Sequence, residues 1–181
     1  TGSLVALPAA DPWTSGAETT LWWLPDTEPA QEIGHLDNIP LQHPIIWSPD
    51  GQQLAAVQQS EPSDQFLLRL ILAAGDGSQA LPYAGGSDLG FLAWSPENDR
   101  FLYGGNGYYA LGQRQAPQQQ SLLPAGLIAD QAAWLDAGKY IVSLNDPQNQ
   151  QWQIHAADTT GGTATLLTGQ GSQAVFQLWT P

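Results

Sequence analysis

The stretch Trp47-Ser48-Pro49-Asp50-Gly51 decides the fold of this chain, and it lies between two apolar runs, residues 44–46 and 54–57. A proline at the second position of a turn presets φ, and an aspartate is tolerated at the third position. The glycine accepts the left-handed backbone that follows. The stretch therefore predicts a hairpin, in which a strand ending in a large aromatic side chain is joined to a second strand by a tight turn.

The same arrangement recurs along the chain. Residues 92–98, Leu-Ala-Trp-Ser-Pro-Glu-Asn, are a partial copy, residues 132–138, Ala-Ala-Trp-Leu-Asp-Ala-Gly, are a weaker one, and the chain ends on Trp179-Thr180-Pro181. The tryptophans at positions 47, 94, 134 and 179 are 47, 40 and 45 residues apart. This spacing is typical of the blades of propeller-type repeat proteins.

Each period carries the same order of four strand segments, here called a, b, c and d, with the tryptophan at the end of strand a. The expected b strands are residues 54–57, 101–103 and 140–142, the c strands are 66–72, 108–111 and 152–155, and the d strands are 79–82, 120–123 and 163–167. The N-terminus begins partway through a repeat, with b, c and d at residues 1–7, 20–27 and 31–36. The sequence therefore predicts an all-β fold, a β-propeller of four blades with four antiparallel strands each.

The predicted propeller is a single domain over residues 1–181. Its repeats cover about residues 1–43 plus 174–181, 44–90, 91–130 and 131–173. We expect the C-terminal strand around Trp179 to pair with the N-terminal strand at residues 1–3. Such pairing would close the ring with ladder hydrogen bonds and remove its exposed sheet edges. A segment of a larger ring of about six to eight blades, and a swapped dimer that completes a larger ring, are the alternatives.

Two of these copies carry a family resemblance. Trp47-Ser48-Pro49-Asp50-Gly51 in full, and Trp94-Ser95-Pro96 in part, resemble the repeats of TolB-like propellers and of the propeller domains of prolyl oligopeptidase-type peptidases. The other two copies depart from the motif and are assigned by spacing and strand order. The resemblance covers essentially the whole chain and implies blades of four antiparallel strands. Because these repeats occur in binding, scaffolding and peptidase-accessory domains, it implies no single activity.

Composition excludes several classes of partner. Seventeen acidic residues face four basic ones, which gives a formal net charge of −13. Such a surface repels phosphate backbones and anionic lipid headgroups, so we expect no nucleic-acid binding, and no apolar run is long enough for membrane insertion. There is no cysteine for a disulfide or a thiolate metal site.

The sequence also gives expectations about the chain's context, its compartment and its oligomeric state. The chain starts at Thr1 and contains no methionine, so we expect a portion of a longer protein. The TolB-like resemblance leans toward an extracytoplasmic bacterial setting, whether periplasmic, secreted or at the cell surface. Either a monomer or a swapped dimer fits the repeats.

Candidate ligand-binding residues lie where the d strands lead into the a strands. They are Asp37, His43, Asp88 and Asp130. If these residues converge at the mouth of a propeller channel, their oxygens and one imidazole suit a hard or borderline divalent cation. The alternative is a solvated acidic rim. Aromatic residues on the c strands form a second candidate, either as core or as a binding patch: Trp22, Trp23, Tyr108, Tyr109 and Trp152.

No motif indicates catalysis. The sequence has no Gly-x-Ser-x-Gly elbow, and His35, His43 and His155 show no motif with serine or aspartate. We expect no cofactor and no enzymatic activity. The prediction is a noncatalytic binding or scaffold module of a larger protein, with a protein partner or small ligand at the propeller face. The alternatives are an accessory propeller that gates substrate for a catalytic domain outside this chain, and a hydrolase or lyase that uses dispersed carboxylates.

Overall fold

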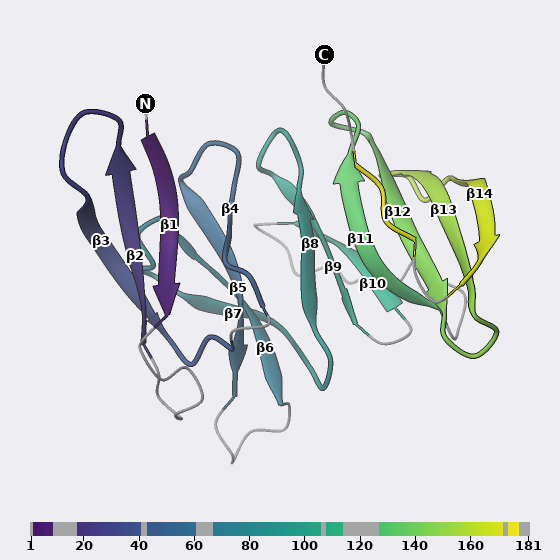
Figure 1. Ribbon diagram of the computed structural model, residues 1–181, viewed down its shortest axis with the longest axis horizontal. Coiled ribbons are helices and arrows are strands. Elements are labelled where there is room, and N and C mark those ends of the chain that lie inside the picture. Colours follow the sequence, from purple (N-terminus) through teal and green to yellow (C-terminus); the bar gives the residue numbers. More distant parts are fainter. Residues whose placement is uncertain are drawn as a thin grey trace. The chain divides into compact units, whose positions relative to one another are not determined.

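The computed structural model describes residues 2–8, 18–40, 43–60, 67–105, 108–113, 127–171 and 174–177, and every regular element in these ranges is a β-strand. The strands form four antiparallel sheets (Figure 1). The chain divides into two compact units, residues 1–91 and 92–181. The prediction of an all-β fold is confirmed. Within the described ranges, no helix is long and apolar enough to span a membrane.

The first unit holds two sheets whose strands follow one another in sequence order. The first sheet consists of β1 (Gly2–Pro8), β2 (Glu18–Pro25) and β3 (Gln31–Asp37). The second sheet consists of β4 (Ile46–Trp47), β5 (Gln53–Gln59), β6 (Leu68–Ala74) and β7 (Leu81–Gly86). Both are meanders, the arrangement that short hairpin connections produce.

The second unit also holds two meander sheets. It begins at Leu92, two residues after the start of β8. The third sheet consists of β8 (Gly90–Trp94), β9 (Arg100–Gly105) and β10 (Tyr108–Gln113). The fourth sheet consists of β11 (Ile128–Trp134), β12 (Lys139–Asp146), β13 (Gln151–Asp158) and β14 (Thr163–Gln170). The predicted order of strands a to d is therefore confirmed in full in the second and fourth sheets.

The first and third sheets each have three described strands. The predicted d strand at residues 120–123 lies outside the described residues, as do Thr1 and residues 178–181 of the predicted closing strand. The described part of that closing strand, residues 176–177, belongs to no sheet. Among the described residues, β1 pairs with β2 only, and no closed ring of strands is formed.

A buried serine organises the first hairpin turn. Ser48 Oγ donates to Asp50 Oδ1 at 2.6 Å and accepts the amide of Gln53 at 3.0 Å. The Gly51 amide donates to the Ser48 carbonyl at 2.8 Å, and Gly51 has φ of 69°. The sequence-based prediction of a tight turn with a left-handed glycine is confirmed.

The related turns keep this geometry with different residues. In the third sheet, Ser95 Oγ donates to Asp99 Oδ1 at 3.0 Å and accepts the Arg100 amide at 3.1 Å. Asn98 replaces the glycine and adopts φ of 62°. The fourth sheet has no serine at this turn; the Leu135 amide donates directly to the Lys139 carbonyl at 2.8 Å. The turn therefore depends on its backbone pairing, and the serine strengthens it.

Each unit has its own core between two sheets. In the first unit, Leu21 and Leu36 of the first sheet pack with Leu54 and Ile71 of the second. In the second unit, the core of the third and fourth sheets combines aliphatic residues with three aromatic ones, Tyr109, Trp134 and Tyr140. The Tyr140 ring lies 5.3 Å from the Trp134 ring and 6.3 Å from that of Tyr109, at 86° to the latter. Such edge contacts are the favoured geometry for buried aromatic pairs.

The outermost pair of strands is irregular in three sheets. A β-bulge shifts the register between β2 and β3, between β6 and β7, and between β13 and β14. A bulge increases strand twist and discourages edge-to-edge pairing with another chain. Pro82 lies in β7, where an edge strand tolerates its missing N–H.

We predict that Ser48→Ala destabilises the chain by about 1–3 kcal/mol, because the buried Gln53 amide loses its acceptor and Asp50 loses a donor. Urea unfolding with an unchanged m-value measures this. Ser3→Ala is the matched control, since Ser3 is exposed in β1 and should change stability by no more than about 0.5 kcal/mol. Equal effects of the two substitutions would contradict the role given to the Ser48 hydroxyl.

Candidate functional site

The two ends of each sheet carry different kinds of connection. The a–b and c–d turns lie at one end, here called the turn end, and the d–a and b–c connections lie at the other, the loop end. Neighbouring turns bond to each other, from the Gly75 amide to the Gln52 carbonyl at 2.9 Å and from the Thr159 amide to the Gly138 carbonyl at 3.0 Å. The predicted ligand residues belong to the loop end.

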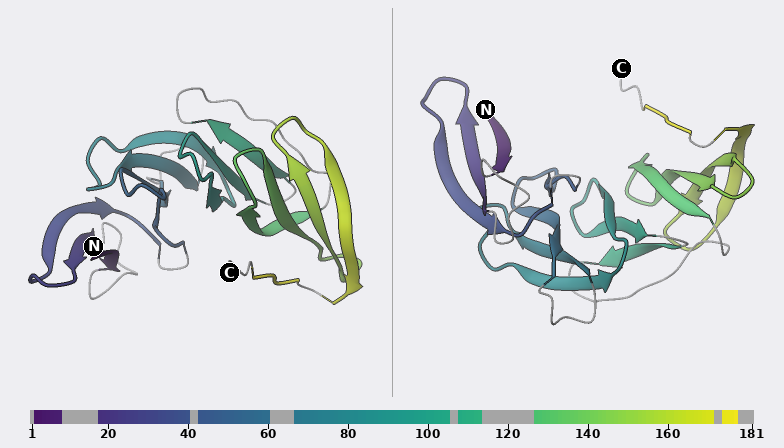
Figure 2. Two further views of the ribbon diagram at one scale, coloured as in Figure 1. Left: turned by 90° about the horizontal axis from the view of Figure 1, so that it is seen from above. Right: turned by 60° about the horizontal axis from the view of Figure 1, so that its bottom comes forward.

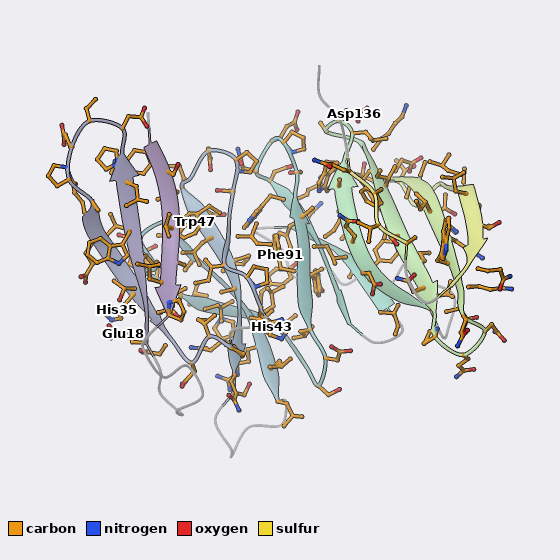
Figure 3. All side chains as sticks on the ribbon, in the orientation of Figure 1. Glu18, His35, His43, Trp47, Phe91 and Asp136 are labelled. Carbon is orange, nitrogen blue, oxygen red and sulfur yellow. The ribbon has the colours of Figure 1, made fainter. Side chains whose placement is uncertain are left out.

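Within the first unit, two of the predicted ligand residues interact. Burial of the imidazole lowers the pKa of His43, and the carboxylate of Asp88 partly offsets this effect. Asp37 is exposed at the end of β3, and its carbonyl accepts Gln58 Nε2 at 3.0 Å. Figure 3 shows His43 apart from His35 and Glu18, which lie together at one end of the first sheet. His43 and Asp88 therefore interact electrostatically, and Asp37 is held by a different element.

Asp130, in the second unit, has a different environment. It lies in β11 at a register shift between Ala129 and Gln131, and Asn145 Nδ2 of β12 donates to its Oδ2. Burial raises the pKa of this carboxyl. A β-bulge commonly re-aims a side chain in this way. Asp130 is thus committed to a side chain of its own sheet.

The structure does not gather the predicted metal ligands into a cluster. In the described ranges of the chain, no three His, Asp or Glu side chains are grouped so that they could hold a metal ion. Asp130 belongs to one unit and the other three candidates to the other. The cation site stays a prediction.

The turn ends of the sheets collect acidic residues. They are Asp26 and Glu28 in the first sheet, Asp50 and Asp76 in the second, Glu97 and Asp99 in the third, and Asp136 and Asp158 in the fourth. Several of these carboxylates accept backbone amides of their own turns: Asp50 from Gln52 at 3.0 Å, Asp76 from Ser78 at 2.9 Å and Asp136 from Gly138 at 2.7 Å. Figure 3 labels Asp136 at the tip of its hairpin. The turn role expected for aspartates in these positions is confirmed.

These hydrogen bonds also favour the charged form of the acids. Bonds from Ser78 lower the pKa of Asp76, and bonds from Thr160 and Gly162 lower the pKa of Asp158. The carboxylates are consequently ionised at neutral pH and held in fixed positions on the hairpin turns.

A shallow pocket of about 430 Å³ lies at the turn end of the fourth sheet. Small apolar residues of β13 and β14 line it together with Leu135, Lys139 and Asp158. Asp158 Oδ1 already accepts the amides of Thr160 and Gly162, at 2.8 and 3.0 Å. The pocket therefore offers one ammonium group and one fixed carboxylate beside an apolar wall, which suits a small polar ligand.

The aromatic candidates on the c strands divide between core and surface. Tyr109 is 1% exposed and belongs to the core of the second unit. Trp22 and Trp23 are half-buried in β2. Trp152 is half-buried beside Gly169, and its Nε1 donates to the Gln170 carbonyl at 3.1 Å. The core interpretation is confirmed for Tyr109.

The sequence analysis missed a polar group on the fourth sheet. Gln131, Ser143 and Asn145 all hydrogen-bond to residues 174–176. Glutamine and asparagine side chains do not titrate, and Ser143 belongs to no catalytic motif. The available signal was the pair Ser143 and Asn145 in a strand whose other residues from 140 to 144 are apolar.

Comparison with known proteins identifies the fold. No protein-family model matches the sequence, and no curated protein matches it. Solved structures do match: a TolB-like protein from Agrobacterium tumefaciens has a TM-score of 0.50 at 13% identity, over 95% of this chain and 83% of that one. The four sheets are β-propeller blades.

Two archaeal propellers give higher scores. The β-propeller domain of the trilobed protease from Pyrococcus furiosus has a TM-score of 0.62 at 15% identity, and the acylaminoacyl peptidase of Pyrococcus horikoshii has 0.62 at 12%. Both matches cover 91% of this chain, but only 53% and 30% of the respective relatives. The predicted similarity to TolB-like and peptidase propellers is confirmed. At such low identity the likeness establishes the fold alone.

We predict that Asp88→Asn lowers the pKa of His43 further, because the carboxylate is the interaction that raises it. NMR titration of the imidazole protons measures this shift, with His155 as the internal control, since burial is the cause of its lowered pKa. A His43 pKa that does not move would contradict the electrostatic interaction.

The lowered pKa of His43 also has a consequence for stability. The folded state binds fewer protons than the unfolded state below the ordinary imidazole pKa of about 6.5. Wild-type stability should therefore fall as pH drops through this value, and His43→Gln should flatten that part of the profile. Urea unfolding between about pH 5 and 7.5 measures the two profiles.

Proposed function

We propose that this chain is a noncatalytic β-propeller module of a larger protein, and that it binds a basic protein partner through the turn ends of its sheets. The observation that carries the proposal is the set of aspartate carboxylates fixed by backbone amides on hairpin turns of the second and fourth sheets. Preorganised charges lose little conformational entropy when a partner binds. The net charge of −13 further favours encounter with a cationic protein.

Closure of the ring is part of this proposal, because it would bring the four turn ends onto one face. We propose that residues 178–181 add a strand to the free edge of β1. Both terminal sheets expose large apolar side chains that closure would cover, Leu7 at 52% and Leu24 at 38% in the first sheet and Leu167 at 58% in the fourth. The trilobed protease propeller is described as having an open velcro topology, so an arrangement in which the terminal strands do not pair is the competing one.

A second candidate function is an accessory propeller that gates substrate for a catalytic domain outside this chain. The likeness to the propeller of the trilobed protease and to acylaminoacyl peptidase favours it. A peptidase domain in the full-length gene product would support this second candidate over the first.

The binding proposal predicts that neutralising turn-end carboxylates weakens binding of a defined oligolysine peptide. The turn-end variant combines Asp50→Asn, Asp76→Asn, Asp136→Asn and Asp158→Asn, which keep the side-chain acceptors of the turns. Calorimetry at low salt should show a loss of affinity of about fourfold or more, since four exposed charge pairs contribute roughly 0.2–1 kcal/mol each.

The matched control neutralises four acids at the loop end: Glu18→Gln, Asp37→Asn, Asp88→Asn and Asp146→Asn. It removes the same charge and should change the affinity much less. Equal losses would mean that the peptide responds to net charge alone, and a larger loss in the control would move the binding surface to the loop end. Either result would overturn the proposal.

The closure proposal predicts that alternate amides of β1, those facing away from β2, are protected from hydrogen exchange. Leu178→Pro should raise the exchange rate of these β1 amides about tenfold. Proline cannot donate a hydrogen bond to the added ladder, so the pairing of the C-terminal strand is weakened. Amides of the turn at residues 48–53 are the internal control. Fast exchange of the outward β1 amides in the wild type would refute closure, and protection that depends on protein concentration would indicate a swapped dimer.

A further inference from the structure

Residues 174–177 cross over one face of the fourth sheet, in front of β11 and β12 (Figures 1 and 2). This face, here called the tail face, is opposite to the one that packs against the third sheet. Cross-strand register places Gln131 opposite Ser143 on it. Ser143 is fully buried and Asn145 is 3% exposed, so the crossing segment covers polar side chains.

The hydrogen bonds between the segment and the sheet follow a regular pattern. The Ala174 amide donates to Asn145 Oδ1 at 3.2 Å, and the Ala174 carbonyl accepts Ser143 Oγ at 2.8 Å. Two residues later, the Phe176 amide donates to Gln131 Oε1 at 3.0 Å and the Phe176 carbonyl accepts Gln131 Nε2 at 3.0 Å. Every second residue of the segment thus has both backbone groups paired, as in a β-ladder, but the partners are side chains.

We propose that Gln131, Ser143 and Asn145 form a clamp that binds an extended chain segment through its backbone, and that its occupant is this chain's own segment 174–177. The primary amide of Gln131 presents one donor and one acceptor side by side, which is what an adjacent strand would present. The segment's own side chains contribute little, because Val175 between the two bound residues is 74% exposed. Ala174 is 6% exposed, so that position requires a small residue.

Comparison with the second sheet supports this interpretation of the polar residues. Val57 holds in β5 the position that Ser143 holds in β12, opposite an aliphatic residue of the next strand: Val57 faces Leu70 and Ser143 faces Ile154. The second sheet therefore buries an apolar residue at the position where the fourth sheet buries a hydroxyl. A buried hydroxyl needs a partner, and the Ala174 carbonyl supplies it.

Asp130 acts as a positioning residue for the clamp. Asn145 donates its amide group to Asp130, which leaves Asn145 Oδ1 directed at the Ala174 amide. With no carboxylate at this position, the side-chain amide could turn over and present its donor to the Ala174 amide, which is also a donor. The register shift beside Asp130 thus serves the clamp.

Amide hydrogen exchange of the full chain, measured by NMR, tests the clamp. In the wild type, the amides of Ala174 and Phe176 should exchange about tenfold more slowly than that of Val175, for which the described residues provide no acceptor. Asn145→Ala should remove the protection at Ala174, and Gln131→Ala that at Phe176. Val175→Ser is the control and should leave the pattern unchanged.

A rescue separates the clamp from general destabilisation. Asn145→Asp alone places two carboxylates together and should deprotect Ala174, whereas Asn145→Asp combined with Asp130→Asn restores a donor and an acceptor and should recover the protection. Equal exchange at Ala174, Val175 and Phe176 in the wild type would overturn the proposal without any variant. Protection that is lost on dilution would assign the occupant to a second copy of the chain and overturn the intramolecular clamp.

Discussion

The architecture depends on the register that each hairpin turn sets between strands a and b. In the second sheet, the buried hydroxyl of Ser48 holds the Gln53 amide, so the first residue of β5 has a fixed position. Because side chains alternate across a strand, that position decides which residues face each side of the sheet. Leu54 and Ala56 enter the core with the first sheet, and Ala55 and Val57 are buried on the opposite face. A slip of one residue would exchange the two faces.

The irregularities of the sheets are concentrated where this register matters least. The inner strands a, b and c pair regularly except beside Asp130, whereas three of the c–d pairs contain a bulge. Outer strands have one unpaired edge, and β14 is exposed along nearly its whole length. A bulge there costs few buried contacts and makes the edge a poor template for another chain. The strand register is therefore regular near the tryptophan and irregular at the outer strands.

Features that depend on repeated local sequence patterns could be predicted from the sequence. Turn residues and tryptophan spacing were enough to predict the described strands of the four sheets and their order, and aspartates in turn positions proved to be turn acceptors. The environment of Asp130 was not predictable, because it results from a register shift and from Asn145 on the next strand. The clamp was missed for a related reason: glutamine, serine and asparagine acquire their role from a segment about 30–45 residues away, and no local pattern encodes such pairing.

The polar tail face distinguishes the fourth sheet from the second, which buries apolar residues on both faces of β5. Apolar surfaces attract any apolar partner, whereas hydrogen-bonding groups accept only a partner whose donors and acceptors match. An apolar surface packed directly on this part of the face would leave Ser143 and Asn145 unpaired. In the structure, the backbone of Ala174 provides the hydrogen-bond partners of both side chains. The fourth sheet therefore carries, in two buried side chains, hydrogen-bonding groups that match the backbone of the segment that follows it.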